Sequence, residues 1–130
     1  MKTLILGNGF VGKPLYESIS NGDVVNDQTS IWGKRLNELT SLDTQHYDVI
    51  INTAAKTSID WCEAHKAETF DTNVVQAVRI AKLLSPKQKY VFFSSACIFK
   101  SDTPEQINYE DSTPNPQCFY TYTKLMAEQL

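Results

Sequence analysis

Short runs with an apolar centre alternate with stretches of helical periodicity along most of the chain. Residues 3–6, 48–52 and 89–94 are the clearest of these runs. Such runs are typical of strands that are buried within a parallel sheet. Weaker runs at 24–25 and 30–32 predict further strands, so the expected sheet has about five strands.

Three stretches between and after these runs have the periodicity of helices. From Val11 the apolar residues recur every four positions until residues 21–22, Asn-Gly, which are a C-terminal stop signal. Residues 60–63 have the spacing of a capping box, and a helix is expected to follow it. A third helix is expected from Phe119 onward. The apolar stripe expected along the second helix comprises Phe70, Val74, Ala77, Val78, Ala81 and Leu84.

The alternation of strands and helices predicts a Rossmann-type α/β fold, in which helices cover both faces of a doubly wound, mostly parallel sheet. Residues 1–130 are enough for one domain with its own core. Residues 100–117 are rich in proline and polar side chains and predict a long surface loop. The last helix carries Leu125, Met126 and Leu130, which need a packing partner, so we expect the chain to end before the domain is complete.

Composition and charge narrow the classes of partner and compartment. The formal net charge of −3 and the scattered basic residues give no surface suited to nucleic acid. No apolar run is long enough for a signal peptide or a membrane span, so we expect a cytoplasmic protein without membrane contact. Three cysteines without CxxC spacing and two separated histidines favour neither disulfides nor a metal site.

A glycine-rich turn lies between the first expected strand and the first expected helix. In this context GxGxxG is the fingerprint of dinucleotide binding, because the glycines permit a tight turn and a close approach of the backbone to a pyrophosphate. We therefore predict that this turn binds the cofactor. The predicted cofactor-binding residues of the turn are Gly7, Gly9, Phe10, Val11 and Gly12.

Other candidate cofactor residues lie further along the chain. Asp27, twenty positions after Gly7, is suited to bind the adenosine ribose hydroxyls and to favour NAD. Lys34 and Arg35 are close enough in sequence to hold the extra phosphate of NADP, so NAD and NADP both stay open. Small residues after the middle strand would leave room for a flat cofactor. This segment contains Asn52, Ala54 and Ala55.

Tyr120 and Lys124 are four positions apart on the last expected helix, so their side chains share one face. A nearby ammonium favours the phenolate and lowers the pKa of a tyrosine toward working pH. Such a phenol can exchange a proton at a carbonyl or alcohol while a cofactor moves the hydride. Ser95 ends the preceding strand and is suited to hydrogen-bond the reacting oxygen. Tyr122 is a poorer candidate, since Met126 stands four positions later.

The chain contains four segments that carry a family likeness: 48–60 (DVIINTAAKTSID), 71–73 (DTN), 94–99 (SSACIF) and 120–128 (YTYTKLMAE). In this order they resemble the extended short-chain dehydrogenase/reductase family, and most closely its dTDP-4-dehydrorhamnose reductase-like sugar-nucleotide enzymes. The resemblance covers nearly the whole chain. It implies that Ser95, Tyr120 and Lys124 form the catalytic triad, that the tyrosine and the lysine also contact the cofactor, and that Asn73 supports the site.

The chain departs from this family pattern in its glycine spacing and its length. The family often has GxxGxxG, one residue more than this turn, and its enzymes continue into a lobe that binds a nucleotide sugar. That substrate lobe is expected to be missing here, and a homodimer of the full-length form stays open. Ala96-Cys97 replaces the acidic pair of related dehydratases, which disfavours dehydration. Cys97 falls where some epimerase/reductases use a cysteine as acid or base; the alternative is a small side chain packed behind the strand.

These features predict the cofactor-binding part of an NAD(P)-dependent sugar-nucleotide reductase or epimerase. One alternative is a non-catalytic NAD(P)-binding regulatory subunit, because one fold supports many functions. Another is an inactive fragment, because an open sheet edge and an unpartnered last helix would make 130 residues unstable. We expect weak cofactor binding and no turnover from the isolated chain.

Overall fold

The computed structural model describes residues 1–21 and 29–130, and a four-stranded parallel sheet in the order β2-β1-β3-β4 lies at its centre. Leu6 pairs in register with Trp32 on one side and with Asn52 on the other, and Asn52 pairs with Phe92. The carboxyl ends of the four strands therefore meet at one edge of the sheet. The strands are β1 (Thr3–Leu6), β2 (Thr29–Trp32), β3 (Val49–Asn52) and β4 (Lys89–Phe92).

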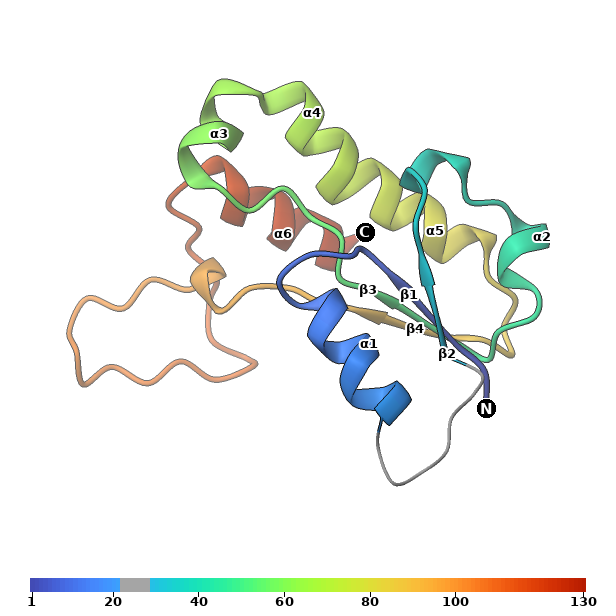
Figure 1. Ribbon diagram of the computed structural model, residues 1–130. Coiled ribbons are helices and arrows are strands. Elements are labelled where there is room, and N and C mark those ends of the chain that lie inside the picture. The colour runs from blue at the N-terminus through green and yellow to red at the C-terminus, as the bar shows by residue number, and fades with distance from the viewer. Residues whose placement is uncertain (22–28) are drawn as a thin grey trace.

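Helices cover both faces of the sheet (Figure 1). One helix, α1, lies on one side, and the continuous run from α4 through η2 to α5 lies on the other side together with α6. The long helices and the run are α1 (Gly12–Asn21), α4 (Lys66–Phe70), the π-helical η2 (Asp71–Gln76), α5 (Ala77–Leu83) and α6 (Phe119–Gln129). Shorter elements are η1 (Leu36–Glu38), α2 (Ser41–Thr44), α3 (Ile59–Ala64) and η3 (Ala96–Ile98).

The doubly wound α/β architecture predicted from the sequence is confirmed. The strong apolar runs are strands, and the weak run at 30–32 belongs to β2, which is the edge strand beside β1. The run at 24–25 lies outside the described residues, so the structure describes four strands where about five were expected. The last helix begins at Phe119, as predicted. Residues 100–117 contain no helix or strand and extend away from the body as a loop (Figure 1).

The predicted start of the second helix is wrong. The N-cap of α3 is Ser58, whose hydroxyl accepts a hydrogen bond from the Trp61 amide at 3.4 Å. Asp60 already lies in the first turn of the helix. Both Ser58 and Asp60 are residue types that cap helices, and the sequence gives two overlapping registers for the cap. The carboxylate of Glu63, assigned to the capping box, contacts a different helix instead.

The predicted apolar stripe between α4 and α5 is only partly correct. Val74 and Ala77 are buried, but Phe70 is 37% exposed and Ala81 is exposed. The polar side chain of Asn73 is buried in place of apolar ones. Two causes account for the difference. The π-helical turns of η2 rotate the buried face relative to a period of 3.6 residues, and polar side chains can be buried where hydrogen-bond partners await them.

The core lies between the sheet and the helical face formed by α5. Leu4 and Leu6 of β1, Ile50 of β3, Leu39 and Ile80 form one buried cluster. Full burial of one such side chain contributes about 1.5–3 kcal/mol, so the centre of the sheet is the best anchored part of the fold. Half-buried residues that pack against the cluster are Trp32, Leu36, Tyr47, Leu84 and Tyr90.

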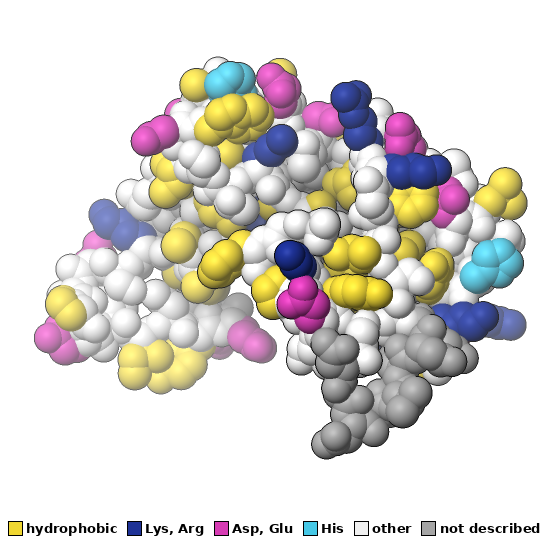
Figure 2. Space-filling model, in the orientation of Figure 1, with side chains coloured by type: hydrophobic (Ala, Val, Ile, Leu, Met, Phe, Trp, Pro, Cys, Tyr) yellow, Lys and Arg dark blue, Asp and Glu magenta, His cyan; other side chains and the backbone are white. Residues whose placement is uncertain are grey.

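Positive and negative side chains are interspersed on the face of the molecule shown in Figure 2. Among residues 1–21 and 29–130, no helix is both long and apolar enough to cross a bilayer. The same ranges contain no cluster of three or more His, Cys, Asp or Glu side chains that is arranged to hold a metal ion.

Candidate active site

The glycine turn passes closely over the end of β3. Gly7 has φ of 98°, a conformation that favours glycine, and a Cβ added there would lie 2.9 Å from the backbone of Ala54. A Cβ at Gly12 would overlap the carbonyl oxygen of Gly7. Around Gly9, in contrast, a Cβ would meet no atom within 4 Å. Gly7 and Gly12 thus allow the close packing of the turn, and Gly9 leaves open space beside the N-terminus of α1.

The remaining predicted residues of the turn are open to solvent. Phe10 is 97% exposed and Val11 is 42% exposed. The first backbone hydrogen bonds of α1 run from the Lys13 amide to the Gly9 carbonyl and from the Leu15 amide to the Val11 carbonyl, each at 3.1 Å. The amides that precede them therefore face outward, as an anion at a helix N-terminus requires.

Thr53 holds the turn against the sheet, a role that no motif in the sequence had predicted. Its hydroxyl donates to the Leu6 carbonyl at 2.8 Å and lies 3.3 Å from the Gly7 carbonyl, and its amide donates to Leu6 at 2.9 Å. These bonds hold the end of β1 and the end of β3 side by side. A hydroxyl residue directly after a central strand is the only sequence signal for this role, and many loop residues share it.

Asn52, predicted to line the cofactor site, is buried, and both polar atoms of its side chain form hydrogen bonds. Its amide nitrogen donates to the Tyr90 hydroxyl at 2.8 Å, and its amide oxygen accepts from the Ala54 backbone at 3.1 Å. The Tyr90 hydroxyl in turn donates to the Ala77 carbonyl at 3.1 Å, and burial raises the pKa of Tyr90 to about 12. The Asn52 side chain thus shapes the turn that carries the half-buried Ala54 and Ala55.

Asp27, predicted to bind the adenosine ribose, lies outside the described residues. The described segment after β2 is Gly33-Lys34-Arg35. Since Trp32 pairs in register with Leu6, these residues lie at the same edge of the sheet as the glycine turn. The Trp32 ring nitrogen donates to the Arg35 carbonyl at 3.2 Å, and the Lys34 ammonium lies 5.6 Å from the Trp32 ring centroid. Both basic side chains belong to exposed residues.

Tyr120 and Lys124 both lie on α6, which confirms the helix that brings them to one face. Tyr120 is half-buried, whereas Lys124 is only 3% exposed. The Lys124 ammonium lies 4.3 Å from the centroid of the Phe92 ring on β4. Burial lowers the pKa of Lys124 to about 8. Within the described part of the chain this ammonium has no ion pair or hydrogen bond, so the ring face is its main electrostatic partner.

Asn73 connects the segment after β3 to the backbone of α6. Its amide nitrogen donates to the Lys56 carbonyl at 3.0 Å and to the Thr123 hydroxyl at 3.1 Å, and its amide oxygen accepts from the Lys56 backbone at 2.8 Å. The Thr123 hydroxyl then donates to the Tyr120 carbonyl at 2.7 Å. Asn73 and Thr123 are both buried. This network fixes α6 against the segment that follows β3.

Ser95 lies beyond the carboxyl end of β4, at the edge where the glycine turn lies. It is half-buried, and its hydroxyl accepts a hydrogen bond from the Cys97 amide at 3.2 Å, which caps η3. Cys97 is exposed. The neighbouring Ser94 donates to the Glu128 carboxylate of α6 at 2.8 Å. The hydroxyl of Ser95 therefore has its own proton to donate toward a substrate oxygen.

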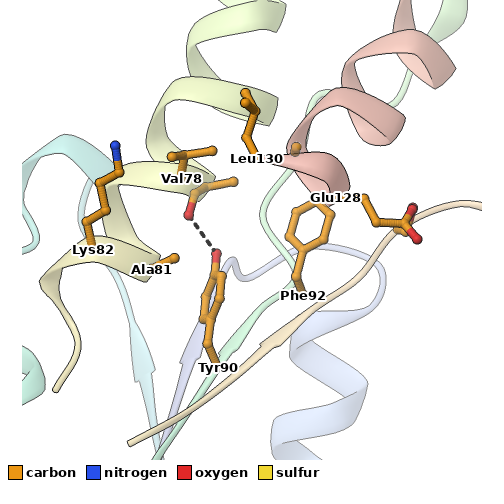
Figure 3. Close-up of a pocket in the computed structure, with 10 residues that line it drawn as sticks. Val78, Ala81, Lys82, Tyr90, Phe92, Glu128 and Leu130 are labelled. Carbon is orange, nitrogen blue, oxygen red and sulfur yellow. Dashed lines mark hydrogen bonds between the residues drawn. The ribbon is translucent and has the colours of Figure 1, made fainter. Parts of the chain in front are cut away.

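A groove of about 360 Å³ lies between α5 and α6 over β4 (Figure 3). Phe92 and Tyr90 of β4 rise into it, and Tyr90 bonds the helix above. Ser95, Tyr120 and Lys124 are not among its lining residues. These three residues therefore lie outside the groove, although Phe92 both lines it and contacts Lys124, and we place the candidate active site at the carboxyl edge of the sheet.

The sequence family described as RmlD substrate binding domain matches residues 1–130. A bifunctional dTDP-4-dehydrorhamnose 3,5-epimerase/dTDP-4-dehydrorhamnose reductase from Arabidopsis thaliana is 30% identical over 100 residues, which cover 72% of this chain and 33% of that protein. A trifunctional UDP-glucose 4,6-dehydratase/UDP-4-keto-6-deoxy-D-glucose 3,5-epimerase/UDP-4-keto-L-rhamnose-reductase from the same plant is 31% identical over 102 residues. These residues cover 73% of this chain and 15% of that protein.

A solved structure of dTDP-4-dehydrorhamnose reductase from Bacillus anthracis, in complex with NADP, superposes with a TM-score of 0.77 and 26% identity, and the match covers 99% of this chain and 49% of that one. The chain thus spans about half the length of this solved relative and a third or less of the two curated relatives. The resemblance found in the sequence motifs is confirmed. Matched over all of residues 1–130, the chain belongs to the RmlD substrate binding domain family.

Proposed function

We propose that residues 1–130 are the NAD(P)-binding Rossmann domain of a sugar-nucleotide reductase or epimerase. The observation that carries the proposal is Lys124, a lysine that is only 3% exposed and has a ring face as its electrostatic partner. Burial of an ammonium costs stability, and a lysine whose pKa is lowered in this way is a candidate functional residue. Membership of the RmlD substrate binding domain family supports the same conclusion.

The residues at the carboxyl edge fit a dinucleotide. The amides of Phe10, Val11 and Gly12 would hold its pyrophosphate, with Gly7 shaping the turn and Gly9 leaving the space for close approach. Ala54 and Ala55, held in place by Asn52, would leave room for the flat rings. When bound, the dinucleotide supplies or accepts the hydride. The NADP complex of the Bacillus anthracis reductase supports this class of cofactor.

Lys34 and Arg35 favour NADP in this proposal. They follow the carboxyl end of β2, beside the glycine turn, and both are exposed. A second phosphate on the adenosine ribose would lie near this edge, where a guanidinium and an ammonium recognise it by charge and hydrogen bonds. Asp27 stays the alternative determinant, for NAD, and lies outside the described residues.

Residues of α6 and of the segment after β4 would transfer the proton to or from the substrate oxygen. Tyr120 would give a proton to, or take one from, the substrate oxygen, and Ser95 would donate a hydrogen bond that orients that oxygen. Lys124 would bind the ribose hydroxyls of the nicotinamide half and favour the phenolate of Tyr120 by its charge. Such contacts would give the buried ammonium polar partners in addition to the Phe92 ring, and Asn73 would keep the helix in place.

The substrate class follows from the relatives rather than from this chain. The two plant proteins are named for dTDP- and UDP-linked sugars, so we propose a nucleotide sugar with a keto group. Cys97 is exposed near Ser95, as an acid or base for a coupled epimerisation would have to be. Reduction alone and reduction coupled to epimerisation therefore both fit the site, and a homodimer of the complete protein is compatible with it.

The proposal is tested in the complete protein that contains these residues, by following NADPH and NADH oxidation with dTDP-4-keto sugars. Tyr120→Phe is expected to lower kcat by about 10²–10⁴-fold, because it removes the proton donor. Tyr122→Phe is the matched control, since that side chain is 49% exposed on the same helix, and it should retain wild-type rates. NADPH is expected to be the better cofactor.

Equal rates in wild type and Tyr120→Phe would contradict the catalytic assignment. Tight binding of NADPH without turnover in any variant would favour the regulatory alternative over the enzyme.

A further inference from the structure

The first turn of α6 is held from outside by an acidic side chain of α3. The Phe119 amide, the first of the helix, donates to the Glu63 carboxylate at 2.7 Å. The two residues are 56 positions apart, so this bond joins distant parts of the chain. The first amides of a helix lack partners within it, and a carboxylate at that end is favoured by both the hydrogen bond and the helix dipole.

Lys66 of α4 completes this contact. Its ammonium lies 3.5 Å from the second oxygen of Glu63 and 5.4 Å from the Phe119 ring centroid. The side chains of Lys66 and Glu63 are 60% and 45% exposed, so water screens the ion pair and its own contribution to stability is small. The short charge-assisted bond to the Phe119 amide is therefore the stronger element of the cluster.

Tyr120 and Lys124 depend on this tether to different degrees. Tyr120 directly follows Phe119 and belongs to the same first turn of α6. Lys124 lies one turn later and is buried against Phe92. The residue before it, Thr123, is bonded to Asn73. Loss of the Glu63 bond would loosen the Phe119 end of the helix, next to Tyr120. The Tyr120 carbonyl would keep its bond from Thr123, and the turn of Lys124 would stay held by its own contacts.

We propose that Glu63 is a positioning residue, which fixes the first turn of α6 so that the Tyr120 hydroxyl is aimed at the reacting atoms. The inference rests on the proposed function, because it concerns the tyrosine of that site. Glu63 itself is not required to touch substrate or cofactor. Small errors in the placement of a reacting group lower rates strongly, so a loose first turn would reduce the chemical step while cofactor binding through the glycine turn and Lys124 persists.

The experiment compares Glu63→Ala, Glu63→Gln and Lys66→Ala in the complete protein. Three quantities are measured: kcat with the keto-sugar substrate, the Kd of NADPH, and amide hydrogen exchange along α6. Glu63→Ala is expected to lower kcat by about tenfold or more, with the Kd within about twofold of wild type. It should also speed exchange at Phe119 but not at Lys124. Glu63→Gln keeps an oxygen acceptor and should restore most of kcat, and Lys66→Ala should behave as wild type.

Several results would overturn the inference. A Glu63→Ala variant with wild-type kcat would refute the inference. If Tyr120→Phe is inactive in the same assay, the proposed function would still hold. Parallel loss of kcat and of NADPH binding would mean that Glu63 supports the whole fold rather than the tyrosine. If the wild type turns nothing over, the proposed function fails, and unchanged exchange at Phe119 in Glu63→Ala refutes the tether on its own.

Discussion

Lys124 lies in an environment that disfavours its positive charge. It is buried against an aromatic ring, and desolvation lowers its pKa from the ordinary 10.5 to about 8. Burial therefore destabilises the charged form in the folded protein. Such a cost is tolerated where a side chain serves binding or catalysis, which agrees with the role proposed for this lysine.

This lysine predicts a pH dependence of stability. Between about pH 8 and pH 10.5 the unfolded chain binds a proton at Lys124 that the folded protein has lost, so the free energy of unfolding rises with pH through this window. Lys124→Met should stabilise the protein by roughly 2 kcal/mol at pH 7 and remove this rise. Urea unfolding at pH 7 and pH 9.5 measures both effects. The upper limit avoids Tyr90, whose raised pKa acts in the opposite direction at higher pH.

The exposed Lys87→Met serves as the control for loss of a positive charge at the surface and should retain the wild-type pH dependence. An unchanged slope in Lys124→Met would show that the Lys124 ammonium is well solvated, and would remove the main electrostatic support for the site.

Strands and long helices follow from the sequence because each has a local cause. The apolar runs at 3–6, 48–52 and 89–94 form β1, β3 and β4, and the prolines and polar residues of 100–117 form the loop. The cap of α3 and the buried face of η2 were not predicted correctly from the sequence. In α3 two capping residues compete, and in η2 a π-helical segment breaks the helical period.

The residues of the candidate site also differ in whether a local sequence pattern predicts them. The glycine turn and the pair on α6 were identified by spacing, which is a local property of the sequence. Thr53, which bonds to Leu6, and Glu63, which bonds to Phe119, act across 47 and 56 positions, so their partners are fixed only by the fold. Asn73 was identified from the family motif, but its two partners on separate segments were not.

The contact between β1 and α1 gives a prediction at the scale of elements. Gly12→Ala should destabilise the protein by about 2 kcal/mol or more, because the added methyl overlaps the backbone of Gly7 and the helix must move away from the sheet. Gly33→Ala is the matched control, since nothing lies within 4 Å of the added carbon, and its effect should be within about 0.5 kcal/mol. Chemical unfolding of both variants is the measurement. Equal stabilities would contradict the described helix approach.

At the scale of the whole molecule, the parallel sheet brings the chemistry to one edge. The ends of β1, β2, β3 and β4 lie in register and carry, in turn, the glycine turn, the basic pair, the alanine segment and Ser95. Ligands of open α/β sheets bind at this edge, so one topological rule accounts for the convergence of segments that are far apart in the sequence. The chain spans about half of its solved relative, and the substrate-binding role of the complete protein belongs to the proposal.

A dinucleotide site at the glycine turn is tested most directly by comparing the Kd of NADPH for Gly9→Ala with that for the wild type. Gly9 has open space in the direction of a side chain, so the substitution should leave the melting temperature nearly unchanged. Its methyl group would nevertheless occupy the space in which the pyrophosphate approaches the backbone, so we expect a Kd that is about tenfold higher or more. An unchanged Kd in a folded Gly9→Ala protein would contradict a dinucleotide site at this turn.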